Sequence, residues 1–544
     1  MARRDAQALG LLTAFAFGLR LVHLGRFELW VDEAATWWFS RMVWGGELAS
    51  AALQEPTPPV YYALIGLLTR IFGEHDVVLR LPSAVAGALS IPAVWLLGRR
   101  LFGLGAGERI GWLAALLLAI HPLHIFYSRE ARVYTLLLLL TTVLVERLWN
   151  ALEAETWGSF LQFTAILMAI CALHVSGYFL GVAVGVQILI GARSWRGRWR
   201  GLVAAALAGL ALLPYTLWAL PQMQGTRAAW SVENLYRVLP EEGSLARTFE
   251  MQLLGADYFA YLRQMDQPPT PQRLRWLAVG AQGVLVLAAL GWGLARARRR
   301  PTSVLVAGWW LSILVPWGLS RAWQTFYHPG RHDFYTVGLV MVVLAAGVEA
   351  LGNHAAFQGG EPRGSWLGQR KAVLVTAVVL LPIVVGALMR GYWLHQLEPT
   401  RHYRPKGEWI ADHTDPTSDR VIAFGILRPI TEHYTRLAGS TVRFESFPSE
   451  TDLHAGWSDD RTLIEDPEAL ESEARARIAA LSEPGGPRRL LVLLRPYQRT
   501  DDAFSATWLV DRHWLGSLRR AGWRPVPGPE GKALGIEVFE RPTP

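Results

Sequence analysis

The stretch LGLLTAFAFGLRLVHL, residues 9–24, is followed after two residues by FELWVDEA, residues 27–34. The first stretch is apolar and makes up most of a predicted membrane span at 8–25, and the second places two adjacent acids, Asp32 and Glu33, just beyond it. Carboxylates beside a bilayer are costly to desolvate, so a pair in this position indicates a functional site. The function then depends on which side of the membrane holds the pair and which cations face it.

The composition indicates a polytopic membrane protein with a soluble tail. Of the 544 residues, 51% are hydrophobic and only 18% are charged, a balance unlike that of a soluble globular protein. Long apolar runs recur as far as about residue 390 and then stop. We therefore predict an all-α membrane domain over residues 1–390 and a separate domain of plausible size over residues 391–544. The single cysteine, Cys171, excludes an intrachain disulfide.

Arginine clusters predict the topology of the membrane domain. They gather in every second loop between the apolar runs, and the positive-inside rule places those loops in the cytoplasm. This pattern explains the net charge of +8 better than nucleic-acid binding does. About eleven spans then put the N-terminus inside and the tail and the acidic pair outside, in the plasma membrane. The predicted spans are 8–25, 77–101, 109–127, 133–149, 157–174, 176–192, 201–220, 272–294, 302–320, 333–351 and 372–390.

One segment decides the orientation. Residues 58–73 are apolar but shorter than the roughly 20 residues that a span needs. Counting them as a span would place the arginine clusters outside, so we interpret them as an amphipathic helix in the membrane interface. Trp37, Trp38 and Trp44 belong to a similar helix just before it. The first outer loop thus carries interfacial helices.

The tail has the pattern of an α/β domain, because short β-rich runs alternate with helical ones. It contains no Gly-rich phosphate loop or nucleophile motif, so a docking or acceptor-binding module is favoured over an independent enzyme. Strands are predicted at 421–424, 441–444, 490–494 and 535–539, and helices at 429–437, 467–481 and 502–520.

The acidic pair has two interpretations. In the functional one, Asp32 is a general base toward an acceptor hydroxyl, and Glu33 orients it or holds a metal ion. In the alternative, the pair is solvated and marks a helix end. Indoles on both sides, at Trp30, Trp37 and Trp38, favour a site at the membrane surface.

Two outer segments supply candidate cations. In residues 121–134, Arg129 and Arg132 are three apart and would share one face of a starting helix, where their guanidinium groups suit phosphate oxygens. Interfacial snorkelling is the alternative. In residues 327–335, Arg331 offers another phosphate contact. His332 is either a proton carrier or, as we favour, a polar interface residue.

The metal content stays open. His328, His332 and Asp333 have the side chains of a zinc site, but their spacing matches no strong ligand pattern. A divalent metal is therefore neither required nor excluded. Lys406 and its aromatic neighbours follow the last predicted span, where they either close over a site or, as we favour, form a linker.

Five segments follow one another along the chain at 32–33, 58–62, 79–83, 98–103 and 127–134. In this order they resemble the GT-C membrane glycosyltransferases of the family 39 protein-mannosyltransferase type, which are relatives of bacterial aminoarabinose transferases. The resemblance implies that Asp32 is the catalytic base, that Glu33 is its companion, and that Arg129, Arg132 and Tyr134 lie near the donor phosphate. Arg331 stands where the family has an arginine. The family often has Gln at the position of Arg129.

The residues and the resemblance together predict an inverting glycosyltransferase. It would move a sugar from a polyprenyl-phosphate donor to an extracytoplasmic hydroxyl of a lipid, glycan or protein, and the lipid phosphate makes a nucleotide cofactor unnecessary. A carrier or flippase for polyprenyl-linked glycans is the main alternative, and a receptor whose outer domain does the work is a weaker one. Transporters place ionisable groups at mid-bilayer, which disfavours the carrier. Further candidate site residues are Glu55, Tyr61, His332 and Lys406.

Overall fold

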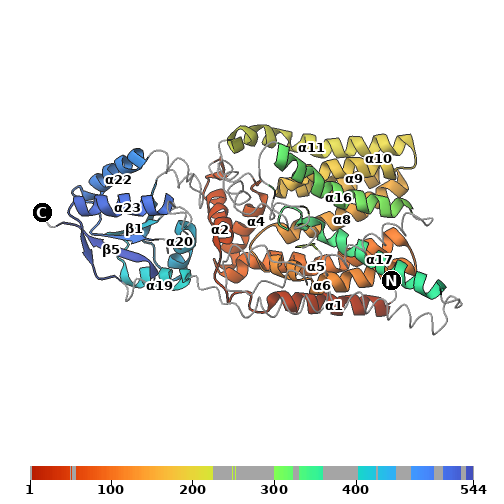
Figure 1. Ribbon diagram of the computed structural model, residues 1–544, viewed down its shortest axis with the longest axis horizontal. Coiled ribbons are helices and arrows are strands. Elements are labelled where there is room, and N and C mark those ends of the chain that lie inside the picture. The colour runs from red at the N-terminus through yellow and green to blue at the C-terminus, as the bar shows by residue number, and fades with distance from the viewer. Residues whose placement is uncertain are drawn as a thin grey trace. The chain divides into compact units, whose positions relative to one another are not determined.

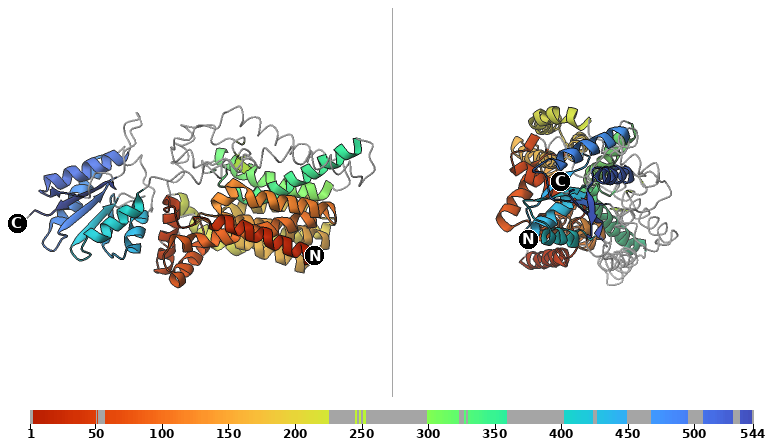
Figure 2. Two further views of the ribbon diagram at one scale, coloured as in Figure 1. Left: turned by 90° about the horizontal axis from the view of Figure 1, so that it is seen from below. Right: turned by 90° about the vertical axis from the view of Figure 1, so that its left-hand side faces the viewer.

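The computed structural model describes residues 3–49, 51, 57–224, 245, 248, 251–252, 299–322, 327, 330–358, 402–423, 427–448, 467–494, 506–528 and 534–542. They divide into two compact units. Figures 1 and 2 show the helices and strands of both. The first unit takes its described residues from 1–24, 80–218 and 231–398, and the second from 25–79, 219–230 and 399–544. Residues of the predicted first outer loop therefore cluster with residues of the tail.

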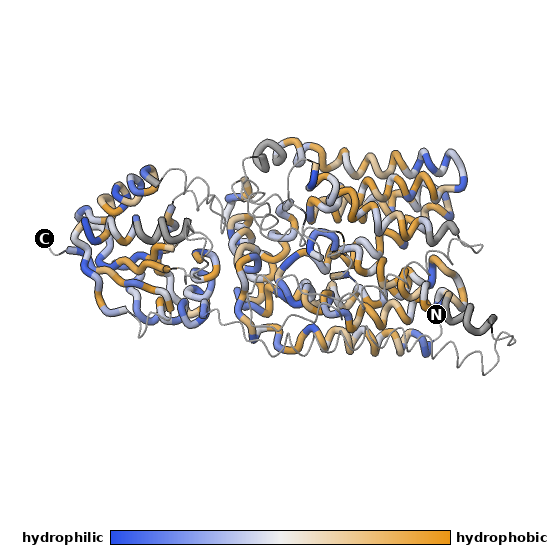
Figure 3. Tube along the Cα trace, viewed as in Figure 1, coloured by the Kyte–Doolittle hydropathy of each residue, from blue (hydrophilic) through white to orange (hydrophobic). Residues whose placement is uncertain are grey.

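The first unit is a bundle of apolar helices. Figure 3 shows apolar residues along α9 and α10, with hydrophilic residues concentrated near helix ends. Among the described residues, four helices are long and apolar enough to cross a membrane, within Asp76–Phe102, Tyr134–Ala154, Trp195–Trp218 and Ser303–Ala322. The helices are α1 (Arg3–Leu21), α5 (Asp76–Phe102), α6 (Ala106–Ile120), α8 (Tyr134–Ala154), α9 (Trp157–Leu173), α10 (Ser176–Gly191), α11 (Trp195–Gln224), α16 (Arg299–Ala322) and α17 (Val337–Gln358). Two of these helices extend into the second unit, α5 by its first residues 76–79 and α11 by its last residues 219–224.

Each of these helices coincides with a predicted span, and the predicted spans 272–294 and 372–390 lie outside the described residues. One prediction was wrong in detail. The predicted span 109–127 is broken into α6 and the short α7 (Pro122–Tyr127). Pro122 has no N–H to continue α6, but its fixed φ suits the first turn of a new helix.

Helices α2 (Val31–Trp44) and α4 (Val60–Phe72) belong to the second unit and match the two predicted amphipathic helices. At 13 residues, α4 is about 20 Å long, which is too short for a hydrocarbon core of about 30 Å. One face of α4 is buried, and the opposite face leaves large apolar side chains exposed. The buried residues include Tyr61, Tyr62 and Ile65, and the exposed ones are Val60, Leu64, Leu67, Ile71 and Phe72.

The tail of the second unit contains a five-stranded sheet in the order β2-β1-β3-β5-β4. Strands β1 (Asp419–Ala423), β2 (Arg443–Ser446) and β3 (Arg489–Leu493) are parallel. Strand β5 (Ile536–Glu540) is antiparallel to both β3 and β4 (Arg524–Val526).

Two hydrophobic clusters cover the two faces of this sheet (Figure 1). One packs α22 (Pro467–Ser482) and α23 (Ala506–Arg520) against the sheet, and the other packs α19 (Tyr403–His413) and α20 (Leu427–Leu437). The strands and helices that the sequence predicts here are confirmed within a few residues. Two elements were not predicted. Strand β4 is very short, and α19 contains Pro405, which is tolerated because it falls in the first turn.

Lys406 lies in α19 and not in a linker, with 4% of its side chain exposed. Its Nζ lies 3.7 Å from the position that a Cβ on Gly535 would occupy, beside the first residues of β5. Burial lowers the pKa of Lys406 to about 8, although the carboxylate of Glu28 opposes the shift. The folded protein therefore loses this proton more readily than the unfolded chain.

Gly66 allows α4 to pack closely against α2, and this contact can be tested. A Cβ at Gly66 would lie 2.2 Å from Cδ1 of Trp44 and 3.0 Å from the carbonyl oxygen of Ser40. We expect Gly66→Ala to destabilise the protein by about 1–3 kcal/mol, because α4 must move away from α2. The measurement is the thermal unfolding midpoint of the full chain in detergent. The matched control is Gly18→Ala in α1, where a Cβ meets nothing within 4 Å. An equal effect of both substitutions would contradict the packing argument.

The proton equilibrium of Lys406 gives a second prediction. The chain has only three lysines, Lys371, Lys406 and Lys532, so selective ¹³Cε labelling yields few signals, and Lys406→Met assigns one of them. We expect the Lys406 signal to titrate near pH 8, below the ordinary lysine value of 10.5. Because the folded pKa lies below the unfolded one, stability should rise as the pH rises from about 8 to 10.5. Lys406→Met should remove that rise, and a Lys406 signal titrating near 10.5 would refute the burial effect.

Candidate active site

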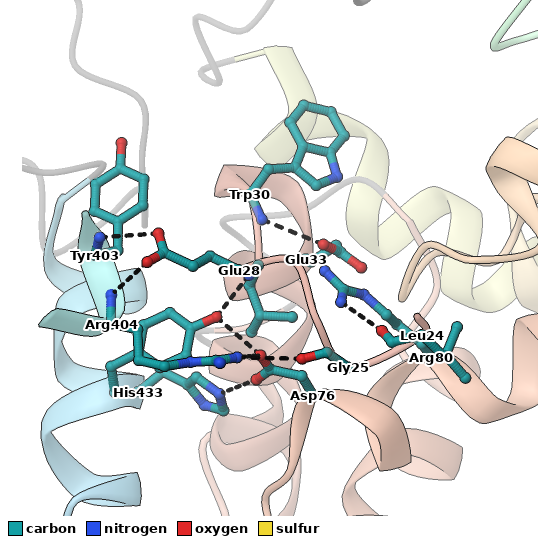
Figure 4. Close-up of polar contacts among 12 residues, drawn as sticks. Leu24, Gly25, Glu28, Trp30, Glu33, Asp76, Arg80, Tyr403, Arg404 and His433 are labelled. Atoms are coloured by element: carbon teal, nitrogen blue, oxygen red, sulfur yellow. Dashed lines mark hydrogen bonds and ion pairs between the residues drawn. The ribbon is translucent and has the colours of Figure 1, made fainter. Parts of the chain in front are cut away.

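The acidic pair opens helix α2 and is buried, with 6% of Asp32 and 2% of Glu33 exposed. The backbone N–H of Trp30 donates a hydrogen bond to Oε2 of Glu33 at 3.2 Å, so this carboxylate bonds back to the residue before the helix (Figure 4). Both acids lie at the positive end of the helix dipole, which favours carboxylates. Glu33 thus has a structural task in fixing the start of α2, and the side chain at Asp32 is presented from that fixed turn.

A second candidate group lies in the first unit and is centred on Tyr134. Arg331 Nε donates a short hydrogen bond to the Tyr134 hydroxyl, and the Arg331 guanidinium carbon lies 5.6 Å from the centre of its ring. The guanidinium carbon of Arg132 lies 5.7 Å from the same centre. The fold therefore brings together two arginines that are far apart in the sequence, and a pair of cations held in this way can bind an anion.

The turn that carries Arg132 is anchored by neighbours that the sequence analysis did not single out. Ser83 Oγ on α5 donates to the carbonyl oxygen of Arg132 at 2.8 Å, and Thr135 Oγ1 donates to the carbonyl oxygen of Ser83 at 3.1 Å. The ring of His174 lies edge-on to Tyr134, with 6.1 Å between centroids. Ser83 falls within the segment 79–83 that carries the family resemblance, which was the available signal.

Arg20 anchors the start of the same turn and is fully buried in α1. Its Nε donates to Ser128 Oγ at 3.2 Å, and its Nη2 lies 2.6 Å from Nδ1 of His124. Its Nη1 donates to the carbonyl oxygens of Ala16, at 2.6 Å, and Ala119, at 3.3 Å. These bonds join α1 to the end of α6, to α7 and to Ser128 at the start of the turn.

The prediction that Arg129 and Arg132 share a helix face was wrong. Residues 128–133 form a turn between α7 and α8, because the helix that would have aligned them ends at Tyr127. Nη2 of Arg129 donates to the carbonyl oxygen of His23 at 3.4 Å, whereas Arg132 lies over Tyr134.

The remaining candidates have other surroundings. Tyr61 is buried beside Tyr62, with 6.1 Å between ring centroids. His332 is half-buried and lies edge-on to Tyr327 at 6.4 Å. Within the part of the chain that the structure describes, no three His, Cys, Asp or Glu side chains form a group that could hold a metal ion. Glu55 and His328 lie outside the described residues.

Comparison with known proteins adds independent findings. Residues 56–218 match the family model described as dolichyl-phosphate-mannose-protein mannosyltransferase. The undecaprenyl phosphate-α-4-amino-4-deoxy-L-arabinose arabinosyl transferase of Pseudomonas aeruginosa PAO1 is 33% identical over 337 residues, covering 59% of this chain and 56% of that protein. The enzyme of the same name from strain LESB58 is 33% identical over 230 residues, covering 40% of this chain and 41% of that protein. The chain thus matches about half the length of these curated relatives.

Solved structures resemble the whole chain. ArnT from Cupriavidus metallidurans bound to undecaprenyl phosphate has a TM-score of 0.58 at 13% identity, covering 98% of each chain. The archaeal oligosaccharyltransferase AglB from Archaeoglobus fulgidus, in complex with an inhibitory peptide and a dolichol-phosphate, has a TM-score of 0.52 at 12% identity, covering 99% of this chain and 74% of that one. At such identities the likeness concerns the fold. The chain therefore has the fold of the GT-C membrane glycosyltransferases, and the resemblance predicted from its sequence is confirmed.

Proposed function

We propose that this chain is an inverting glycosyltransferase that moves a sugar from a polyprenyl-phosphate donor to an extracytoplasmic acceptor hydroxyl. The observation that carries the proposal is the meeting of Arg132 and Arg331 on Tyr134 in a chain with the GT-C fold. The names of its relatives, which include undecaprenyl phosphate-linked aminoarabinose transfer, support a lipid-linked donor. A carrier for such lipids would use the same cations but would leave the sugar–phosphate bond intact.

In the proposed reaction, Asp32 accepts the proton of the acceptor hydroxyl as its oxygen attacks the anomeric carbon. The bond from that carbon to the phosphate oxygen breaks, and the lipid phosphate leaves with the electron pair. A single displacement inverts the anomeric centre. Negative charge grows on the leaving phosphate, so guanidinium groups placed beforehand stabilise the transition state more than the ground state. Arg132 and Arg331 are assigned this role, and Tyr134 holds them.

We also propose the topology that this reaction needs. Eleven spans, with domains at 1–390 and 391–544, put Asp32, Arg132 and Arg331 on the extracytoplasmic side. The shortness of α4 supports this orientation, because a helix of about 20 Å lies in the interface instead of adding a twelfth span. Its exposed apolar face suits the lipid boundary.

The two acids should differ in importance. We expect Asp32→Asn to lower the rate of lipid phosphate release about 10²- to 10⁴-fold, the range for loss of a general base. Glu33→Gln should cost much less, because the amide oxygen still accepts the hydrogen bond from Trp30. The measurement is phosphate release from purified protein with a polyprenyl-phosphate sugar and acceptor. Parental activity in Asp32→Asn would rule out Asp32 as the base. Transbilayer movement of the donor without release would favour the carrier.

Substitutions of the three arginines should also differ in how much they lower turnover. We expect Arg331→Gln and Arg132→Gln each to lower turnover about 10²- to 10³-fold, as loss of a transition-state donor does. Arg129→Gln is the matched control and should have a smaller effect, because the described contact of Arg129 is with His23 and not with Tyr134. Turnover with the lipid-linked donor decides the order. If Arg129→Gln proves as damaging as the other two, the phosphate site has been placed on the wrong residues.

A further inference from the structure

Three sets of contacts connect residues of the tail to the region of the acidic pair, and each is called a support. The first support is a charged helix cap. The carboxylate of Glu28 accepts hydrogen bonds from the backbone N–H groups of Tyr403, at 2.9 Å, and Arg404, at 3.1 Å (Figure 4). These are the first two residues of α19, whose amides have no partner within the helix. A carboxylate at this end also suits the helix dipole. Residues 25–30 are thereby bonded to the start of α19.

The second support is Asp76, a carboxylate with 4% of its side chain exposed. Its Oδ2 accepts hydrogen bonds from Arg404 Nη2 at 2.7 Å and from the Tyr434 hydroxyl at 3.0 Å. Its Oδ1 lies 3.0 Å from Nε2 of His433. The Tyr434 hydroxyl also accepts a hydrogen bond from the backbone N–H of Leu29 at 2.6 Å. The buried carboxylate of Asp76 thus binds residues of α19 and α20, and through Tyr434 it is connected to Leu29, two residues before the start of α2.

The third support contacts α2 itself. Trp37 is fully buried, and its ring lies edge-on to His433 with 5.0 Å between centroids. Its Nε1 donates to Glu74 Oε2 at 3.0 Å, close in sequence to Asp76. Trp37 lies about one helical turn after the acidic pair, so whatever holds this indole also holds the helix that presents Asp32.

We propose that Asp76 is a positioning residue which, through Tyr434, His433 and Arg404, fixes the start of α2 from the tail domain and so sets the place of Asp32. This inference rests on the proposed function for the role of Asp32. It gives the tail a task in the reaction without making it a second catalytic domain. None of the four residues needs to touch a substrate to act in this way.

The positioning effect depends on the negative charge of Asp76, which the donors from the tail surround. A buried carboxylate is tolerated only while donors surround it, and all three side-chain donors to Asp76 described here come from α19 and α20. Loss of its charge weakens the bonds to the tail and frees the Tyr434 hydroxyl from its place between Asp76 and Leu29. The start of α2 then becomes more mobile, and a catalytic group displaced by about 1 Å can lose about 10²-fold in rate.

The test uses Asp76→Asn and Tyr434→Phe in the full-length protein. Hydrogen exchange is measured on peptides covering residues 25–44, and kcat and KM are measured as lipid phosphate release from undecaprenyl phosphate-linked aminoarabinose. We expect exchange in 25–44 to quicken about tenfold in both variants. In Asp76→Asn we expect kcat to fall about 10²-fold with KM within about threefold, the signature of misplacement and not of lost donor binding. Asp76→Glu should restore part of the rate.

The matched control is Asp419→Asn. Asp419 is also fully buried, but it pairs with Arg489 at 2.6 Å inside the tail, away from α19's first turn and residues 25–30. It should leave kcat and the exchange of 25–44 within about threefold of the parent protein. Equal losses in Asp419→Asn would reduce the effect to tail stability and overturn the proposal, as would unchanged exchange in Asp76→Asn. If even the parent protein releases no phosphate, the proposed function fails with this donor, while the exchange data still decide the positioning contact.

Discussion

A carboxylate keeps its charge away from water only when hydrogen-bond donors surround it, and Asp76 meets that condition through Arg404, His433 and Tyr434. Removing one partner of a buried charge typically costs about 3–5 kcal/mol, so these contacts form or fail together. Residues 25–79 and the tail are consequently one compact unit although more than 300 residues of chain separate them. The helix that presents Asp32 and Glu33 is packed within that unit, so its exact place depends on a distant part of the sequence.

The same dependence explains what the sequence could and could not predict. Apolar runs and strand-like runs are local patterns, and they predicted the helices of the first unit and four of the tail strands closely. The break at Pro122 was also visible, since proline ends a helix, yet it was overlooked because the residues around it are apolar. The partners of Asp76 carry no local signal. A tyrosine and a histidine on an amphipathic helix look like ordinary surface or core residues until the fold brings them to a carboxylate.

For the candidate site, the sequence predicted one part of the arrangement and missed another. The sequence offered Arg132, Tyr134 and Arg331 as candidates, and the fold brings the two arginines to the ring of Tyr134. The assignment of Arg129 to the same face failed because it assumed a helix where the chain turns. The turn is held by bonds from Arg20, which carries no signal in the sequence, and from Ser83, whose only signal is its place in the segment 79–83. Residues that only shape a backbone are therefore the hardest to find, although they decide which arginine can reach the tyrosine.

Two guanidinium groups near one ring repel each other, and a tyrosine face offsets only about 0.5–2 kcal/mol of that cost per cation. A fold that gathers them beside an anchored turn places two cations where one anionic ligand could contact both. Such preorganisation is what transition-state stabilisation of a departing phosphate requires. It has a counterpart at Asp32, where rigidity comes from Glu33 on one side and from the tail on the other. Both halves of the proposed reaction thus depend on groups that are fixed before the substrate arrives.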